Sequence, residues 1–347
     1  MRSFLLSVIV LALVVTARAQ TSTSALPGKQ WHATTPEDAG WDLDQTGKVN
    51  DYLKEMGVTS FMLIQHGLVV EQGGDVAART ELHSCRKSFL SALIGIAANK
   101  QIHLGDTLAK LGVDDNPPSL TAEEKRATVR DLLEARSGIY HPAAYETSGM
   151  KAGRPERGSH PPGTFWYYNN WDFNALGGIY EKATRQSIYD ALATEIATPI
   201  GMQDYRAKDG KYVKEASSRF PAYTIKMSAR DFARFAMLYL HGGNWNGTQV
   251  VPAGWVAASV HPYSDANSGG YGYLWWTGDS ATPGRHAKYP FPPGSFWLEG
   301  HLGQYAVVVP SLDLIVVTRV DENSTDAVVS KAQVSKLMRY VVKAAAH

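Results

Sequence analysis

One stretch of the sequence indicates the fold, Ser84-Cys85-Arg86-Lys87-Ser88-Phe89-Leu90-Ser91. On a helix that runs to about Ala98, its serines and its lysine share one face at positions i, i+3, i+4 and i+7. The other faces are apolar and include Cys85 and Phe89. A helix at the surface would carry several charges on its polar face. The narrow polar stripe therefore predicts a buried helix that faces a small polar cavity.

The spacing of Ser84 and Lys87 has a chemical meaning. A serine hydroxyl becomes a good nucleophile when a base removes its proton, and a lysine one helical turn away lies within reach. Burial lowers the pKa of a lysine, which provides neutral amine near pH 7. The N-terminus of the helix places backbone N–H donors beside a developing oxyanion. The pair thus predicts an acyl-accepting serine with a lysine as its proton-transfer partner.

The spacing alone is weak evidence. About one Ser-x-x-Lys is expected by chance in a chain of this size, and a second occurs at Ser148-Gly149-Met150-Lys151. That copy lies in a Gly-rich stretch between prolines, so we expect a surface loop there. For Ser84 considered alone, a helix-capping serine followed by a surface lysine explains the pattern about as well as catalysis. Cys85 falls on the apolar face, where a small core residue is expected rather than a nucleophile.

Further motifs follow in sequence order: Thr128–Ile139, Pro162–Asn170, Met227–Asp231, Gly270–Trp276 and Gly300–Gln304. Together with Ser84 and Lys87, this ordered set resembles the serine β-lactamase and penicillin-binding-protein superfamily, in particular its class C β-lactamase and esterase branch. The resemblance covers nearly the whole chain after its N-terminal segment. It favours the catalytic interpretation of Ser84 over the capping one.

The resemblance implies a role for each matching residue. Ser84 would be the acylated nucleophile and Lys87 its proton partner. Tyr168 would assist as a base in acylation, deacylation or both. Asn170 would hydrogen-bond the substrate or position Lys87. Most other aromatic side chains near Tyr168 are expected to pack in a core.

The last motif would form the opposite wall of the site. His301 and Gly303 would line it, and the backbone N–H groups of Gln304 and Ser84 would form the oxyanion hole. A glycine just before an apolar strand suits close approach of the backbone to a ligand. His301 stands where many β-lactamases carry a lysine, and an imidazole holds a substrate carboxylate less firmly than an ammonium group does. This departure favours uncharged esters or amides over penicillins and cephalosporins.

The chain pattern predicts an α/β (α+β) fold. Strands are expected at 60–65 and 68–72 near one end and at 304–309 and 314–319 near the other. We expect one antiparallel sheet built from both chain ends and flanked by helices, with a mainly helical lobe of about 101–250 inserted into it, and a site in the cleft between them. Helices are expected at 44–56, 84–98, 128–134, 228–239 and 326–346.

The N-terminus indicates export. Residues 1–19 combine a positive start, an apolar run and a small-x-small cleavage site, which is typical of a secretory signal peptide. The run is shorter than a spanning helix needs, so no membrane anchor is expected after cleavage. We expect a mobile leader over 20–40, rich in Ser, Thr, Ala and Pro up to Pro36, and the hydrolase domain over 41–347, in the periplasm or secreted. A single cysteine permits no internal disulfide.

Composition limits the partners. The formal net charge of +1 provides no basic field for nucleic acid or for an anionic membrane. The histidines show no metal-ligand spacing, so neither a metal nor another cofactor is expected. We expect an exported serine hydrolase that acts on a small ester, amide or short peptide. The alternatives are a true β-lactamase, a D-Ala-D-Ala-type peptidase, or a non-catalytic cell-wall peptide-binding module of the same fold.

Overall fold

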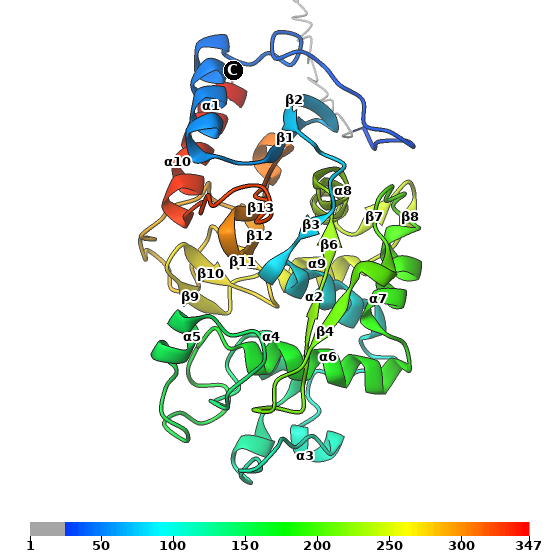
Figure 1. The fold of residues 1–347 in the computed structure, drawn as a ribbon, viewed down its shortest axis with the longest axis vertical. Coiled ribbons are helices and arrows are strands. Elements are labelled where there is room, and N and C mark those ends of the chain that lie inside the picture. The colour runs from blue at the N-terminus through cyan, green and yellow to red at the C-terminus, as the bar shows by residue number, and fades with distance from the viewer. Residues whose placement is uncertain (1–24, 347) are drawn as a thin grey trace, which may run out of the picture.

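The computed structural model describes residues 25–346, so the expected signal peptide lies outside the described residues. Its centre is an eight-stranded sheet in which every neighbouring pair is antiparallel (Figure 1). In sheet order the strands are β2 (Leu68–Gly74), β1 (Ser60–Gln65), β14 (Leu314–Arg319), β13 (Gln304–Val309), β12 (Phe296–Gly300), β11 (Trp276–Thr277), β10 (Gly269–Tyr271) and β9 (Ser264–Ala266). The first and last strands of the chain therefore pair with each other. The predicted sheet from both chain ends is confirmed.

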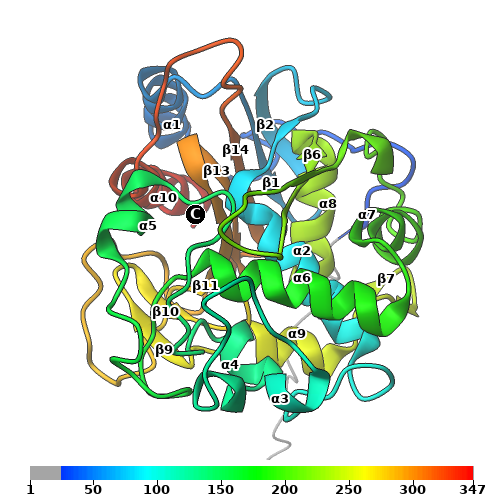
Figure 2. The same cartoon turned by 60° about the horizontal axis from the view of Figure 1, so that its bottom comes forward.

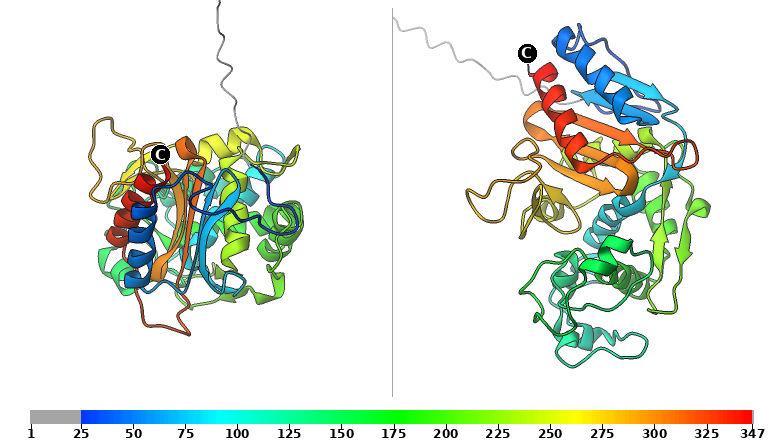
Figure 3. Two further views of the ribbon diagram at one scale, coloured as in Figure 1. Left: turned by 90° about the horizontal axis from the view of Figure 1, so that it is seen from above. Right: turned by 60° about the vertical axis from the view of Figure 1, so that its left-hand side comes forward.

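Both faces of the sheet are buried, which explains why its central strands are almost continuously apolar. Val307 and Val309 of β13 belong to the core on one face, and Ala306 and Val308 belong to the core on the other. The first core is covered by α1 (Leu43–Met56) and α10 (Lys331–Ala345), which lie side by side (Figure 3). The second core faces the helical part of the molecule.

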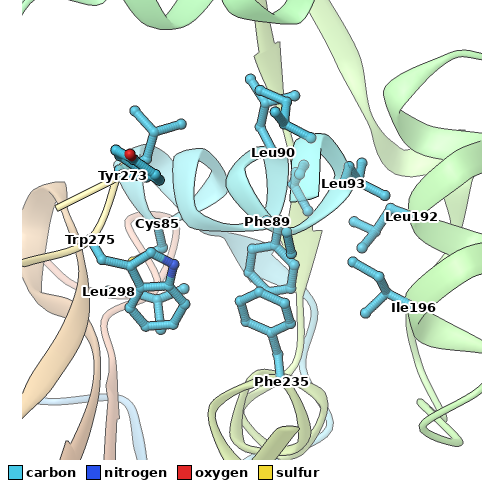
Figure 4. Close-up of a cluster of buried hydrophobic side chains, with 14 of the residues drawn as sticks. Cys85, Phe89, Leu90, Leu93, Leu192, Ile196, Phe235, Tyr273, Trp275 and Leu298 are labelled. Carbon is cyan, nitrogen blue, oxygen red and sulfur yellow. The ribbon is translucent and has the colours of Figure 1, made fainter. Parts of the chain in front are cut away.

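The helix of the Ser84 stretch lies in this second core. It begins as a 3-10 turn, η1 (His83–Cys85), and continues as α2 (Arg86–Ala97). Phe89 stacks on Phe235 of α8 (Ala229–Leu240), with ring centroids 3.8 Å apart (Figure 4). Although α8 falls in the range expected for the inserted lobe, it contacts β1, β13 and β14 and so belongs to the sheet layer.

Helices α6 (Asn170–Thr184), α7 (Ile188–Ala191) and α9 (Ala253–Ser259) contact α2, and α6 crosses in front of it (Figure 2). Further helices are α3 (Leu108–Leu111), α4 (Val129–Leu133) and α5 (Ser148–Gly153). The short strand pairs are β3 (Thr80–Glu81) with β6 (Lys226–Met227), β4 (Lys211–Val213) with β5 (Ala222–Thr224), and β7 (Asn244–Trp245) with β8 (Thr248–Gln249).

Two local predictions are wrong. The described part of the leader is not a loose segment: Thr34 N–H donates to the Val69 carbonyl, and the buried Arg234 donates to the Gly28 carbonyl at 2.8 Å. The second Ser-x-x-Lys is at the surface as expected, but it forms the short helix α5, which the Thr147 side chain caps by accepting from Met150 N–H. The hydrogen bonds that hold these two segments involve Val69, Arg234 and Thr147, and the apolar pattern of the sequence does not indicate these partners.

Across residues 25–346, none of the helices combines the length and the apolar character that crossing a bilayer would require.

Candidate active site

Ser84 stands on a tight turn at the start of the buried helix. His83, just before it, has φ of 48°, in the left-handed region that non-glycine residues rarely adopt. The neighbouring Leu82 N–H donates to the Ile225 carbonyl at 2.9 Å, and Arg86 Nη1 donates to the His83 carbonyl at 3.1 Å. The turn therefore holds Ser84 half-buried where α2 meets the cleft described below.

Three of the predicted residues come together around the lysine amine. Lys87 Nζ lies 2.8 Å from Ser84 Oγ and 2.7 Å from the Tyr168 hydroxyl, and donates to both. Lys87 is buried, and Nζ lies 4.8 Å from the ring centroid of Phe173. Tyr168 reaches it from the segment just before α6. Residues separated by more than 80 positions in sequence thus form one continuous hydrogen-bonded group.

The surroundings of Lys87 and Tyr168 shift the pKa values of both groups toward their uncharged forms. Burial, followed by the positive charge of Arg86, holds the pKa of the Lys87 amine well below its usual value. Burial also raises the pKa of the Tyr168 phenol above its usual value. The arrangement therefore favours the uncharged form of the amine and keeps the phenol protonated near pH 7.

The polar stripe divides into two parts. Ser88 Oγ donates to the Leu274 carbonyl at 2.8 Å, and Ser91 is fully buried. Only Ser84 and Lys87 of the stripe take part in the group around Tyr168, so the expectation of a single cavity along all four residues is wrong. Cys85 is buried as expected, with its thiol donating to the Gln304 carbonyl at 3.2 Å.

Two adjoining hollows of about 390 and 320 Å³ meet at Ser84. Both are lined by His301, by Thr147, which precedes the second Ser-x-x-Lys, and by Met150, which lies within it. We call the two hollows together the cleft. The larger one also has Tyr168, Trp276, Tyr305, Leu302, Glu299 and Lys331 in its walls. The smaller one includes His83, Tyr145, Glu146, Asn170 and Glu215.

The predicted substrate-binding residues separate into two sets. His301 is exposed in the cleft, and Asn170 lines the smaller hollow while its Nδ2 donates to the Tyr145 carbonyl at 2.6 Å. No hydrogen bond joins Asn170 to Lys87 in the described part of the chain. Gly303 and Gln304 line neither hollow.

The hairpin between β12 and β13 explains why Gly303 and Gln304 lie away from the cleft. Gly300 pairs with Gln304, so the turn between them projects past the end of the sheet. A Cβ on Gly303 would lie 2.5 Å from Val329 Cβ, and the Gln304 side chain accepts from Arg319 Nε at 2.6 Å. Gly300 is the glycine that approaches the nucleophile turn.

Two further residues of this region, Lys331 and Arg86, were not predicted from the sequence. Lys331, at the start of α10, pairs with Glu299 at 2.9 Å, and its Nζ lies 3.9 Å from the Trp276 ring centroid. Arg86, inside the helix motif itself, is completely buried. Lys331 is more than 240 positions from Ser84, and no spacing signal connects them. A charged residue on an otherwise apolar face of α2 was the available signal for Arg86.

Potential metal ligands do not gather in the described residues, where no group of three or more His, Cys, Asp or Glu side chains could hold an ion.

Comparison with known proteins gives the class. A sequence model of the family described as Beta-lactamase matches residues 52–334. The chain therefore belongs to the Beta-lactamase family. An uncharacterized protein of Alkalihalophilus pseudofirmus is 20% identical, with 78% of this chain and 85% of that protein covered.

Solved structures share the fold at low sequence identity. A Bacillus anthracis protein provisionally assigned as a 6-aminohexanoate-dimer hydrolase has a TM-score of 0.65 and 18% identity, covering 92% of this chain and 88% of its own. A penicillin-binding-protein homolog from Caulobacter crescentus has a TM-score of 0.61 and 16% identity, covering 86% and 98%. A class C β-lactamase has a TM-score of 0.58 and 15% identity, covering 85% and 96%.

Proposed function

We propose that the protein is a serine hydrolase that forms an acyl-enzyme on Ser84 and hydrolyses small esters or amides. One observation carries the proposal: a buried amine, Lys87 Nζ, lies 2.8 Å from the hydroxyl of Ser84 and 2.7 Å from that of Tyr168, and both of these residues line the open cleft. A nucleophile, a neutral base and a proton donor are thus in mutual contact.

The chemistry proceeds in two steps. Ser84 Oγ attacks the substrate carbonyl while its proton passes to the neutral Lys87 amine, and the acyl–leaving-group bond breaks as a proton returns to the leaving group through Tyr168. Water then attacks the ester on Ser84 while its proton passes to the same amine, and the acyl–Oγ bond breaks as that proton returns to Ser84 Oγ, which releases the acid and restores the free serine. We place the oxyanion between Ser84 N–H and an N–H of the turn at Gly300 to Leu302, since Gln304 does not line the cleft.

The charges of the cleft favour substrates without a carboxylate. The acidic side chains in its walls are Glu146, Glu215 and Glu299, of which Glu146 pairs with Arg154 and Glu299 with Lys331. The lowered pKa of Lys87 makes this lysine a weaker source of compensating charge than an exposed lysine. A carboxylate such as that of a penicillin would meet net negative walls, whereas an uncharged ester or amide would not.

Labelling with a fluorophosphonate tests the catalytic proposal. We expect a covalent mass increase on Ser84 in the wild type and none in Ser84→Ala. Ser148→Ala is the matched control, because it removes the serine of the second Ser-x-x-Lys, and it should be labelled like the wild type. A folded wild type that takes no adduct would support a non-catalytic binding module instead.

A substrate comparison tests the class. We expect turnover of a p-nitrophenyl ester and little or none of nitrocefin. Nitrocefin turnover comparable to ester turnover would favour the true β-lactamase, and release of D-Ala from a D-Ala-D-Ala peptide with little ester turnover would favour the peptidase.

We also propose that the protein is exported after cleavage behind Ala19. The sequence pattern of residues 1–19 supports this. Mass spectrometry of the protein from the periplasm or the medium of an expressing bacterial host should give a chain that begins at Gln20; a full-length cytoplasmic chain would contradict it.

A further inference from the structure

Arg86 is a buried charge that the proposed chemistry leaves without a role. It is 0% exposed, and two of its nitrogens, Nε and Nη2, have no hydrogen-bond partner within the described chain. Its guanidinium carbon lies 5.1 Å from the ring centroid of Tyr145 and 5.2 Å from that of Tyr223. The guanidinium is therefore held between two aromatic side chains rather than by an acid.

A buried guanidinium without an acidic partner destabilises the fold. Across residues 25–346 no carboxylate comes within ion-pair distance of Arg86, while Glu81 is near enough for the arginine to lower its pKa. Burying a charge without a paired partner costs several kcal/mol, on the order of what breaking a buried ion pair costs. An apolar side chain of similar size would serve packing better. A role in the site would offset this cost.

The contacts of Arg86 lead directly to the reacting residues. Its Nη1 holds the carbonyl of His83 at 3.1 Å, and His83 is the left-handed residue whose conformation presents Ser84. Arg86 is also the immediate neighbour of Lys87 in the chain. One side chain thus touches the turn of the nucleophile from behind and carries the positive charge nearest in sequence to the base.

We propose that Arg86 is a positioning residue for the Ser84–Lys87 pair: it fixes the strained His83 turn by hydrogen bonding and keeps the lysine amine uncharged through its own buried positive charge. This inference rests on the proposed function. The pKa shifts of two neighbouring groups support it, because the charge of Arg86 lowers the pKa of Lys87 and that of His83.

Other titratable groups near the pair do not replace this charge. Cys85 lies on the same turn as Lys87, and burial raises the pKa of its thiol, so it stays neutral. Tyr168 approaches from the segment before α6 and is also neutral. Glu299 of β12 raises the pKa of Tyr168, and Tyr168 in turn raises the pKa of Tyr271 of β10, so neither adds a positive charge near Lys87. Arg86 is the neighbouring cation that acts on Lys87 most strongly.

The pH dependence of fluorophosphonate labelling tests the proposal. In Arg86→Gln the lysine should take up a proton more readily, so the acidic limb of the labelling rate should move up by about one pH unit, and labelling below the limb should fall about tenfold. Arg86→Lys keeps the charge but loses the fork-shaped donor. It should retain the wild-type limb, with a lower rate because the His83 turn is held less firmly.

A second buried arginine provides the control. Arg234 is equally buried, but it holds backbone carbonyls of residues 27–29, away from the cleft. Arg234→Gln should lower thermal stability and leave the acidic limb unmoved. If Arg86→Gln does not fold, Arg86→Met removes the charge without leaving a polar group buried.

The outcomes are distinct. A folded, charge-removed Arg86 variant with the wild-type limb would overturn the proposal and leave Arg86 a packing residue. A wild type that is not labelled at any pH would instead remove the proposed function itself.

Discussion

Lys87 Nζ and the Tyr168 hydroxyl lie 2.7 Å apart, and their pKa values are displaced in opposite directions. Burial and the charge of Arg86 lower the pKa of the amine, and burial raises the pKa of the phenol. Of the two groups, the amine is therefore the one that more readily offers a free lone pair, while the phenol keeps its proton. This relationship supports the proposal that Lys87 removes the proton of Ser84 and that Tyr168 donates one.

Lys87→Met should abolish labelling and at the same time stabilise the protein. The pKa of the amine lies well below its ordinary value of 10.5 in the fold, so folding releases a proton at any pH between the lowered pKa and 10.5. Between the lowered pKa and 10.5, this group makes the free energy of unfolding rise by about 1.4 kcal/mol per pH unit. In the variant that slope is lost, and the free energy of unfolding at pH 7 is higher. Urea unfolding at several pH values measures both effects.

Lys54→Met is the matched control for that experiment, because the Lys54 side chain is 80% exposed. It should change neither labelling nor the pH slope. Equal pH slopes in Lys87→Met and the wild type would show that the lysine is charged in the fold.

Tyr168→Phe should separate substrates by their leaving groups. An amide nitrogen must be protonated as it departs, whereas p-nitrophenolate leaves without a proton. We expect amide turnover to fall by about 100-fold and p-nitrophenyl ester turnover to fall less, as measured by kcat/KM for a matched anilide and ester. Tyr205→Phe, which removes a hydroxyl that donates to the Tyr189 carbonyl, should affect neither. Equal losses on both substrates would assign Tyr168 to a step that is common to them.

Gly300→Ala should disturb the nucleophile turn. A Cβ at this position would lie 2.4 Å from the Leu82 carbonyl oxygen and 3.1 Å from Cys85 Sγ, so the β12 end or the turn must move. We expect a loss of about 1–3 kcal/mol in the free energy of unfolding and a labelling rate at least tenfold lower. Gly105→Ala, where no heavy atom lies within 4 Å of the added carbon, is the control. A Gly300→Ala protein that is labelled like the wild type would show that the turn tolerates the displacement.

Much of the fold could be predicted because its signals are local. The hairpin strands at 60–65 and 314–319 have the bounds expected from their apolar runs and turn residues. Helices α4 and α8 were expected to begin at Thr128 and Ser228, and they begin directly after these residues, whose side chains cap them. In each case a capping side chain or a turn stands within a few residues of the element it bounds.

The candidate site was predictable only where a motif connected its residues. Ser84, Lys87 and Tyr168 were named from spacing and resemblance, and their atoms meet. Gly303 and Gln304 were named in the same way but lie outside the cleft. The strand register of β12 and β13 decides which residues of that motif reach the turn, and register depends on pairing partners that periodicity does not reveal.

The sequence by itself determined that a serine and a lysine share one face of a buried helix, because an α-helix brings residues three apart together wherever it lies. Only the tertiary structure decided their chemical state. Burial near Phe173 and the charge of Arg86 lower the pKa of the Lys87 amine, and Tyr168 completes the group from 81 positions further along the chain. The solvation and the neighbouring charges that set a pKa come from packing of distant segments, and for this reason the pattern of residues alone could not supply them.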